Sequence, residues 1–521
     1  MHTIPEALEI ARAALRSGDR QQSRFIYERI LAALPDEPTA LSELGMLCLG
    51  ERALDEAERY LRRALELRPQ DPVGHNNLYL VLRASGRNEQ AIETMRSAIA
   101  LAPYLPELHN NLGIALKDAG QLEVAADSFR EALVLRPVYA EAYYNLANTL
   151  VLAHELDEAE AAFRRAVELA PSDSDTRNNF GALLRLRGKL DEAAGEFEAA
   201  LATNPSSAEA HQNRAVLRLL RGQFAEGWVE YESRWQMPGA KLPNYAEPRW
   251  RGEPLVGRTL RLWAEQGLGD TIQFVRYAPL VRAQGARILL DCPPALRPLL
   301  ATAAGIDAFD RAEDPREWAD YHVPLLSLPS YCNPDPSATA HLVPYLRPQP
   351  NRVAFWRERL ADVADFKVGI TWQGSPGYAG DYFRSLPLAW FAKLSKIPGV
   401  RLFSLQKNFG REQLLSQSGV VDLADELDEE GRAFTDTAAA IANMDLVISS
   451  DTAVAHLAGA LGAPVWVVLQ QTPNWRWLLA REDSPWYPSM RLFRQSTLGN
   501  WKPVFDAIAR ELAALAQSNA R

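Results

Sequence analysis

The chain has 521 residues, of which 47% are hydrophobic and 23% charged, and its formal net charge is -10. This length suffices for about three or four domains, and the composition is that of a soluble globular protein. The acidic balance argues against a nucleic-acid surface, because binding to phosphates is dominated by clustered Lys and Arg.

The cysteines and the first residues bear on the cellular compartment. Cys48, Cys292 and Cys332 are too few and too scattered for a disulfide framework or a zinc knuckle, which favours a reducing compartment. Residues 1–30 alternate charged with apolar side chains, so we expect neither a signal peptide nor a membrane anchor. No later run approaches membrane-spanning length. The sequence therefore predicts a cytoplasmic protein.

The first half of the chain repeats every 34 residues. Proline marks the period at Pro35, Pro69, Pro103, Pro137, Pro171 and Pro205. Alanine keeps the same register at Ala57, Ala91, Ala125, Ala159 and Ala193. Glycine falls between the two helices of a unit at Gly18, Gly86, Gly120, Gly188 and Gly222. This pattern matches the tetratricopeptide repeat and predicts an α-solenoid with a capping helix over residues 1–236. Its concave surface would bind a peptide or protein.

A column of asparagines follows the same period. Its members are Asn77, Asn111, Asn145, Asn179 and Asn213. We expect them to line the inner groove, where amides can hydrogen-bond the backbone of an extended peptide. The alternative is that asparagine is merely tolerated at this position. The unit that should carry the first member has Glu43 instead.

The array ends after Gly222, and the pattern then changes. Residues 237–257, rich in Pro and Gly, predict a linker. From residue 258, strands alternate with helices in two series, which predicts two doubly wound α/β domains at 258–350 and 351–521 with a cleft between them. The second domain ends in a C-terminal helix.

Residues 445–470 carry the clearest local signal. The apolar run Leu446–Ser449 predicts a buried parallel strand, and Ser450 and Asp451 begin a helix that Gly462 ends. Such a helix start presents unpaired N–H groups and the positive end of the helix dipole, which suits a diphosphate. An ordinary buried helix capped by Ser450 or Asp451 fits the stretch equally well.

Two motifs give the second half a family resemblance. Gly267-Leu268-Gly269-Asp270 matches a Gly-x-Gly-Asp turn, and residues 451–464 (DTAVAHLAGALGAP) match a longer Asp-x-Gly-x-x-His signature with Ala453 in place of its usual glycine. Residues 258–515 thus resemble GT-B glycosyltransferases of the heptosyltransferase-like family. The repeats joined to such a module are similar to O-linked N-acetylglucosamine transferases and bacterial flagellin glycosyltransferases.

The resemblance implies an overall fold and an activity. The fold class is α plus α/β: a tetratricopeptide solenoid followed by a GT-B pair of Rossmann-like domains. The implied activity moves a sugar from a nucleotide-sugar donor to a Ser or Thr hydroxyl of a protein acceptor of the flagellin type, with inversion. No metal-ligand spacing stands out, so we expect no metal and no cofactor besides the donor. The alternatives are a scaffold with an inactive module and a transferase for glycans or lipids.

The resemblance also implies roles for single residues. Asp270 is the expected base, although it could instead cap a helix starting at Thr271. His456 either donates to a phosphate or is a buried, satisfied imidazole, and Lys407 either binds the donor or is only solvated. The expected donor-binding residues are Arg384, Gln406, Lys407, Ser450, Asp451, Thr452, Ala453 and His456.

Four aromatic residues near the end of the chain have two interpretations. They are Trp475, Trp477, Trp486 and Tyr487. Their faces could stack on a nucleotide or sugar, but we favour packing of the C-terminal helix at residues 500–516 against the domains.

Overall fold

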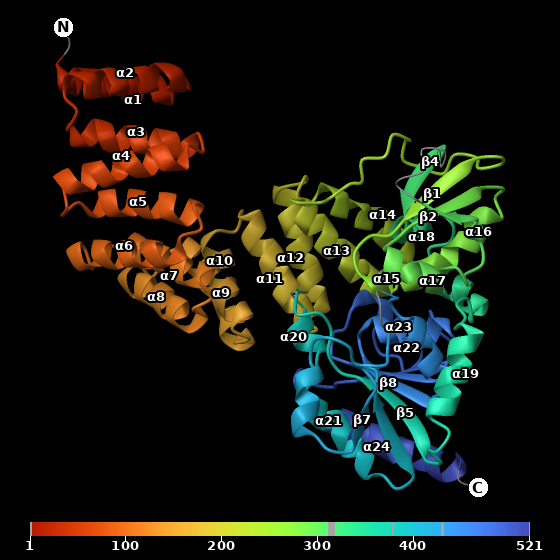
Figure 1. Ribbon diagram of the computed structural model, residues 1–521. Coiled ribbons are helices and arrows are strands. Elements are labelled where there is room, and N and C mark those ends of the chain that lie inside the picture. The colour runs from red at the N-terminus through yellow and green to blue at the C-terminus, as the bar shows by residue number, and fades with distance from the viewer. Residues whose placement is uncertain (1–2, 311–317, 378–379, 429–431, 520–521) are drawn as a thin grey trace. The chain divides into compact units, whose positions relative to one another are not determined.

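The computed structural model describes residues 3–310, 318–377, 380–428 and 432–519 (Figure 1). The chain forms two compact units. The first comprises Met1–Leu184 and Ala199–Pro205, and the second comprises Arg185–Glu198 and Ser206–Arg521. The second unit therefore contains the end of the repeat array together with both sheets.

The repeats are antiparallel helix pairs, and the predicted helical array is confirmed. The helices are α1 (Ile4–Arg16), α2 (Arg20–Ala33), α3 (Pro38–Gly50), α4 (Leu54–Leu67), α5 (Pro72–Ala84), α6 (Asn88–Leu101), α7 (Pro106–Asp118), α8 (Leu122–Leu135), α9 (Ala140–Leu152), α10 (Leu156–Leu169), α11 (Ser174–Leu186), α12 (Leu190–Thr203), α13 (Ala208–Leu220) and α14 (Phe224–Tyr231), followed by the 3-10 turn η1 (Glu232–Gln236). The periodic alanines from Ala57 to Ala193 are fully buried, because the paired helices touch there.

The turns within the pairs need a left-handed backbone. The five periodic glycines have positive φ, and so do Arg52 and His154, which occupy the same register in the two units without glycine. A left-handed conformation is strained for a residue with a Cβ, so packing of the repeat imposes it at these two positions.

The second unit contains two parallel sheets. The strands of the first are β1 (Thr259–Trp263), β2 (Arg287–Asp291), β3 (Ala308–Phe309) and β4 (Tyr321–Pro324), and those of the second are β5 (Phe366–Thr371), β6 (Val400–Ser404), β7 (Val420–Asp422), β8 (Leu446–Ser450), β9 (Val465–Leu469) and β10 (Met490–Arg494). The strand orders are β3-β2-β1-β4 and β10-β9-β8-β5-β6-β7. The order reverses next to β1 and between β5 and β8, and ligands of such sheets bind at the carboxyl ends of the strands at these points.

The helices that follow β1 lie between successive strands, except α24, which follows β10. They are α15 (Leu268–Phe274), α16 (Ala278–Arg282), α17 (Arg297–Leu300), α18 (Leu328–Tyr331), α19 (Pro350–Arg359), α20 (Asp381–Arg384), α21 (Leu388–Ala392), α22 (Thr435–Ile441), α23 (Ala453–Ala460) and α24 (Lys502–Asn519). Residues 237–258, all described, form neither a helix nor a named strand. Strand β4 ends at Pro324, because Leu325–Ser327 turns into a 3-10 helix.

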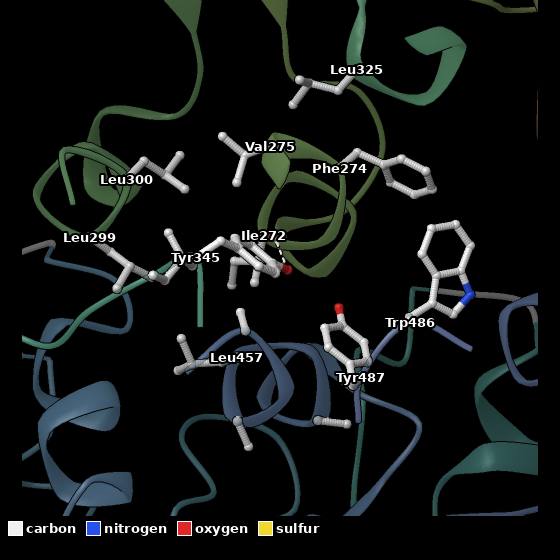
Figure 2. Packing of buried hydrophobic residues seen from close by; sticks show 14 of the residues in the cluster. Ile272, Phe274, Val275, Leu299, Leu300, Leu325, Tyr345, Leu457, Trp486 and Tyr487 are labelled. Atoms are coloured by element: carbon white, nitrogen blue, oxygen red, sulfur yellow. Dashed lines mark hydrogen bonds between the residues drawn. The ribbon is translucent and has the colours of Figure 1, made fainter. Parts of the chain in front are cut away.

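Two hydrophobic clusters hold the second unit together. The larger one joins α14, α15 and α23 through residues such as Trp228, Phe274 and Leu457. Figure 2 shows Tyr345 beside Ile272 of α15, with a dashed line from its hydroxyl to the Ile272 backbone, and Leu457 of α23 nearby. The smaller cluster seats α24 on the second sheet through Phe505, among others. Within the described residues no helix combines the length and the apolar character needed to cross a membrane.

Candidate active site

A cavity of about 930 Å³ lies where both sheets reverse their strand order. Most of the predicted site residues line it: Gly267, Gly269, Asp270, Arg384, Gln406, Lys407, Asp451, Thr452, Ala453 and His456. Ser450 does not line it, since this residue is fully buried at the end of β8. The turn before α15 and the turn before α23, which lie about 180 residues apart in the sequence, therefore share one crevice.

Asp270 belongs to a helix that begins earlier than predicted. Helix α15 starts at Leu268 with Gly267 as its N-cap, so Asp270 is the third helical residue and not the cap of a helix at Thr271. Its Oδ2 accepts from the Gly267 N–H at 2.9 Å. Its Oδ1 accepts from the Arg476 guanidinium. Each carboxylate oxygen has a second lone pair, so both can accept one more hydrogen bond.

Arg476 is a site residue that the sequence analysis missed. It lies in the short 3-10 turn η8 (Trp475–Trp477), lines the cavity, and exposes only 6% of its side chain. Besides Asp270 it donates to Gln273 Oε1 at 2.7 Å and Asn474 Oδ1 at 2.9 Å. Its guanidinium lies 4.1 Å from the centre of the Trp475 ring. The sequence held one hint, a cation between two tryptophans, but nothing in it pointed to a partner 206 positions away.

The start of α23 is open toward the cavity. Its N-cap is Thr452, with φ -131° and ψ 173°, and not Ser450 or Asp451 as predicted. The Thr452 hydroxyl lies 3.1 Å from Ser449 Oγ and caps no helix amide. In the described part of the chain, no backbone or side-chain group accepts from the N–H of Ala453 or Val454. Both residues line the cavity, so their amides and the helix dipole are available to an anion.

The two helix starts touch at Gly269. A Cβ added to Gly269 would lie 3.2 Å from both Ala453 Cα and His456 Cδ2. A real Cβ rarely comes this close to a backbone atom, which yields less readily than a flexible side chain, so glycine suits this approach.

His456 is buried, and its role toward a phosphate stays a prediction. It is 6% exposed, its Nδ1 lies 3.0 Å from the Tyr487 hydroxyl, and its ring stacks on Trp477 with centroids 5.2 Å apart. Burial lowers the pKa of His456 well below its ordinary value, and nearby arginines act in the same direction. The imidazole is therefore neutral at pH 7, buried on one edge, and in contact with the cavity.

Arg384 faces the start of α23 from α20. It donates to Asp381 Oδ1 at 2.9 Å and to the Asp451 carbonyl at 3.2 Å. Burial raises the pKa of the Asp451 carboxyl, while the positive charge of Arg384 opposes this change. The guanidinium thus brings positive charge to the side of the cavity where the open amides lie.

Gln406 and Lys407 line the cavity but already have protein partners. Gln406 Oε1 accepts from the N–H groups of Trp372 and Gln373, and its Nε2 donates to two carbonyls. Both lone pairs and both amide protons are therefore used, which leaves no hydrogen-bonding capacity for a ligand. Lys407 is not simply solvated, since its ammonium donates to the Leu427 carbonyl and, at 2.9 Å, to that of Asp428.

The four late aromatic residues are all buried, as packing requires, but their partners differ from those expected. Trp475 packs edge-on against Trp228 with centroids 5.0 Å apart, and Trp486 packs against Phe274 at 5.7 Å. These contacts tie the segment to α14 and α15, whereas the C-terminal helix α24 belongs to the other cluster.

The asparagine column links neighbouring repeats. Asn111 Nδ2 donates to Asn76 Oδ1 at 2.7 Å, and Asn145 Nδ2 donates to Asn110 Oδ1 at 3.0 Å. The same 35-residue step joins Asn77 to Ser42 and Asn179 to Tyr144. At the first position Glu43 accepts from Arg12 at 2.8 Å. Asn213 also has an interaction partner. Peptide binding by this column stays a prediction, and its observed contacts are structural.

The fold and the cavity define the class: tetratricopeptide repeats joined to a GT-B-like pair of parallel α/β domains. Comparison with known families agrees. Residues 8–72, 110–174 and 181–245 match the tetratricopeptide repeat, and residues 431–501 match glycosyltransferase family 9 (heptosyltransferase). The chain therefore carries tetratricopeptide repeats and a glycosyltransferase family 9 domain. The matched stretch contains Asp451, His456 and Arg476.

Individual proteins are similar to parts of the chain. Protein FlbA of Caulobacter vibrioides is 30% identical over 319 residues, which cover 55% of this chain and 52% of FlbA. The chain thus matches about half the length of this curated relative. A tetratricopeptide repeat protein from Parabacteroides merdae is 17% identical over 46% of this chain and 94% of its own, with a TM-score of 0.40. TTC0263 from Thermus thermophilus is 25% identical over 34% of this chain and 97% of its own, with a TM-score of 0.30.

Proposed function

We propose that the chain is a glycosyltransferase that moves a sugar from a nucleotide-sugar donor to a Ser or Thr hydroxyl of a protein docked on the repeats. The observation that carries this proposal is the shared cavity. The Asp270 carboxylate and the open start of α23 line one crevice, in a fold with a glycosyltransferase family 9 domain.

The donor diphosphate is assigned to the start of α23. The N–H groups of Ala453 and Val454 have no acceptor in the described chain, and they lie at the positive end of the helix dipole beside the cavity. Arg384 lies next to them. Charge develops on the diphosphate as the sugar leaves, and fixed donors of this kind stabilise it in the transition state. Arg384 and the helix start would supply positive charge here, so we propose that transfer is metal-independent.

The acceptor hydroxyl is assigned to Asp270. This carboxylate takes the proton of the hydroxyl while the oxygen attacks the anomeric carbon, and the bond from that carbon to the diphosphate oxygen breaks with its electron pair going to the diphosphate. Attack from the side opposite the leaving group inverts the anomeric centre. General base catalysis of this kind contributes a factor of about 10²–10⁴. Arg476 and the Gly267 amide hold the two carboxylate oxygens in place.

The protein acceptor is assigned to the repeats, which commonly form docking surfaces. The flagellin type of acceptor rests on the resemblance of the whole architecture alone. A scaffold whose α/β module is inactive is the first alternative, but the joint presence of Asp270, Arg384 and His456 at one cavity argues against it. The second alternative is a glycan or lipid acceptor.

The test incubates the purified chain with a panel of nucleotide sugars and flagellin and follows the acceptor by mass spectrometry, with and without EDTA. We expect a mass increase of one sugar that EDTA does not reduce. If no donor gives a shift and no nucleotide binds, the scaffold alternative stands. A shift on a glycan or lipid but never on a protein would overturn the proposed acceptor.

A further inference from the structure

A buried arginine outside the proposed chemistry forms one end of a chain of contacts that leads to the cavity. Arg276 is 1% exposed and, in the described part of the chain, no carboxylate contacts it. It donates to the carbonyls of Gln273 and Trp486 at 2.8 Å each and to the Tyr345 hydroxyl at 2.9 Å. A buried charge without a counter-charge is costly, so a role for Arg276 that offsets this cost is expected.

Two tyrosine rings lie against this guanidinium. Its carbon lies 4.4 Å from the centre of the Tyr487 ring and 4.6 Å from that of Tyr345. Figure 2 shows the hydroxyls of Tyr345 and Tyr487 between the helix of Ile272 and the helix of Leu457. The Tyr345 hydroxyl donates a hydrogen bond to the Ile272 carbonyl at 3.0 Å and accepts one from Arg276. Its hydroxyl is thereby fixed.

The remaining hydroxyl, that of Tyr487, lies 3.0 Å from His456 Nδ1. Burial and the charges of Arg276, Arg384 and Arg476 keep this imidazole neutral, so one ring nitrogen carries a proton and the other accepts. The His456 nitrogen is a better acceptor for the Tyr487 proton than the Tyr345 oxygen, because that oxygen already accepts from the Arg276 cation. The positive charge of Arg276 also favours a Tyr487 proton that points away from it. Tyr487 therefore donates to Nδ1.

The other edge of the imidazole faces the cavity. His456 Cδ2 would lie 3.2 Å from a Cβ placed on Gly269, which puts the neighbouring Nε2 on the side of the Gly269 turn. No described protein group bonds Nε2, and His456 lines the cavity. We propose that Tyr487, backed by Arg276, is a positioning residue that fixes His456 as the Nε2–H tautomer, so that this N–H donates to the anionic part of the substrate. Donation from Nε2 to the substrate rests on the proposed function.

The first test needs no ligand. Full-length protein labelled with ¹⁵N-histidine gives imidazole spectra that distinguish the tautomers, and His456→Gln assigns the signal. We expect a protonated Nε2 and an unprotonated Nδ1 in the wild type, and a mixture or the reverse in Tyr487→Phe, which keeps the ring. A protonated Nδ1 in the wild type, or a spectrum unchanged by Tyr487→Phe, would overturn the proposal.

A matched control separates this effect from the loss of any buried hydroxyl. Tyr277 is as buried as Tyr487, and its hydroxyl donates to the Asn333 carbonyl at 3.4 Å, away from the cavity. Tyr277→Phe should leave the His456 tautomer as in the wild type. If both Tyr→Phe variants change the His456 signal equally, general loosening of the core explains the result and the assignment to Tyr487 fails.

The second test measures binding of inorganic pyrophosphate by calorimetry. Loss of a correctly presented N–H should weaken binding in Tyr487→Phe by roughly tenfold, and Tyr277→Phe should bind as the wild type does. Unchanged affinity in a variant whose tautomer has shifted would overturn the donor role of Nε2. Failure of the wild type to bind pyrophosphate would contradict the anion site of the proposed function, while the spectra would still decide the tautomer.

Discussion

The two helices that begin at the cavity differ in how their first turns are completed. In α15 the Asp270 carboxylate returns to the Gly267 amide, so a side chain of the helix itself supplies the negative charge. In α23 the Thr452 side chain caps no amide, and the N–H groups of Ala453 and Val454 remain open. A helix start that contains its own carboxylate has little use for an anion, whereas an open one attracts it. This difference supports the proposed arrangement, in which the acceptor binds at α15 and the diphosphate at α23.

The largest effect should follow from Asp270→Asn. The amide keeps the size and can still accept from Gly267, but it cannot take a proton. We expect the turnover rate to fall by about 10²–10⁴ with unchanged affinity for the donor nucleotide. Rates from acceptor mass and affinities from calorimetry check this. Asp506→Asn on the exposed face of α24 is the control, and a fully active Asp270→Asn variant would remove the assigned base.

Replacing Arg384 with methionine should act on the other helix start. The variant loses charge-assisted bonds to a phosphate, so nucleotide binding should weaken by roughly 10–100-fold. Arg401→Gln, an exposed arginine on β6, should bind normally. Calorimetric titration compares the two. Equal affinity in both variants would mean that the diphosphate does not lie beside α20.

The contact between the two helix starts can be tested with Gly269→Ala. The new Cβ would press on Ala453 Cα at 3.2 Å, so the free energy of unfolding should fall by about 1–3 kcal/mol. Gly195→Ala in α12, with nothing within 4 Å, should instead gain about 0.5–1 kcal/mol. Urea unfolding measures both. A Gly269→Ala variant as stable as the wild type would contradict this prediction and show that Ala453 and His456 yield to the added methyl group.

The smallest expected effect concerns pH. Because the pKa of His456 is depressed in the folded state, the unfolded chain binds the extra proton as the pH falls through the ordinary imidazole value. The wild type should therefore lose up to about 1.4 kcal/mol of stability for each pH unit below about 6.5. His456→Gln should show a flatter dependence, and the exposed His341→Gln should follow the wild type. If stability depended on pH equally in the wild type and in both variants, the result would contradict a buried neutral His456.

The parts of the fold that a short-range pattern encodes could be predicted. The 34-residue period gave the helix pairs, and the apolar run before Ser450 gave β8, because burial of a periodic face leaves a trace in the sequence. The cap of α23 was misplaced, since Ser450, Asp451 and Thr452 are all good N-caps and only the backbone decides among them. Tertiary contacts left no such trace. Arg476 bonds Asp270 only because two distant chain segments meet in the fold. The same holds for Gln406, whose side-chain amide is fully hydrogen-bonded to neighbouring backbone groups.

The last repeat belongs to the unit that holds the cavity, and this has an evolutionary consequence. Trp228 of α14 donates from Nε1 to the Pro334 carbonyl at 3.0 Å and packs against Trp475, the neighbour of Arg476. Gain or loss of whole 34-residue modules before residue 184 would leave each of these contacts intact. Selection could therefore lengthen or shorten the repeat array in single steps while the residues around the cavity stayed the same.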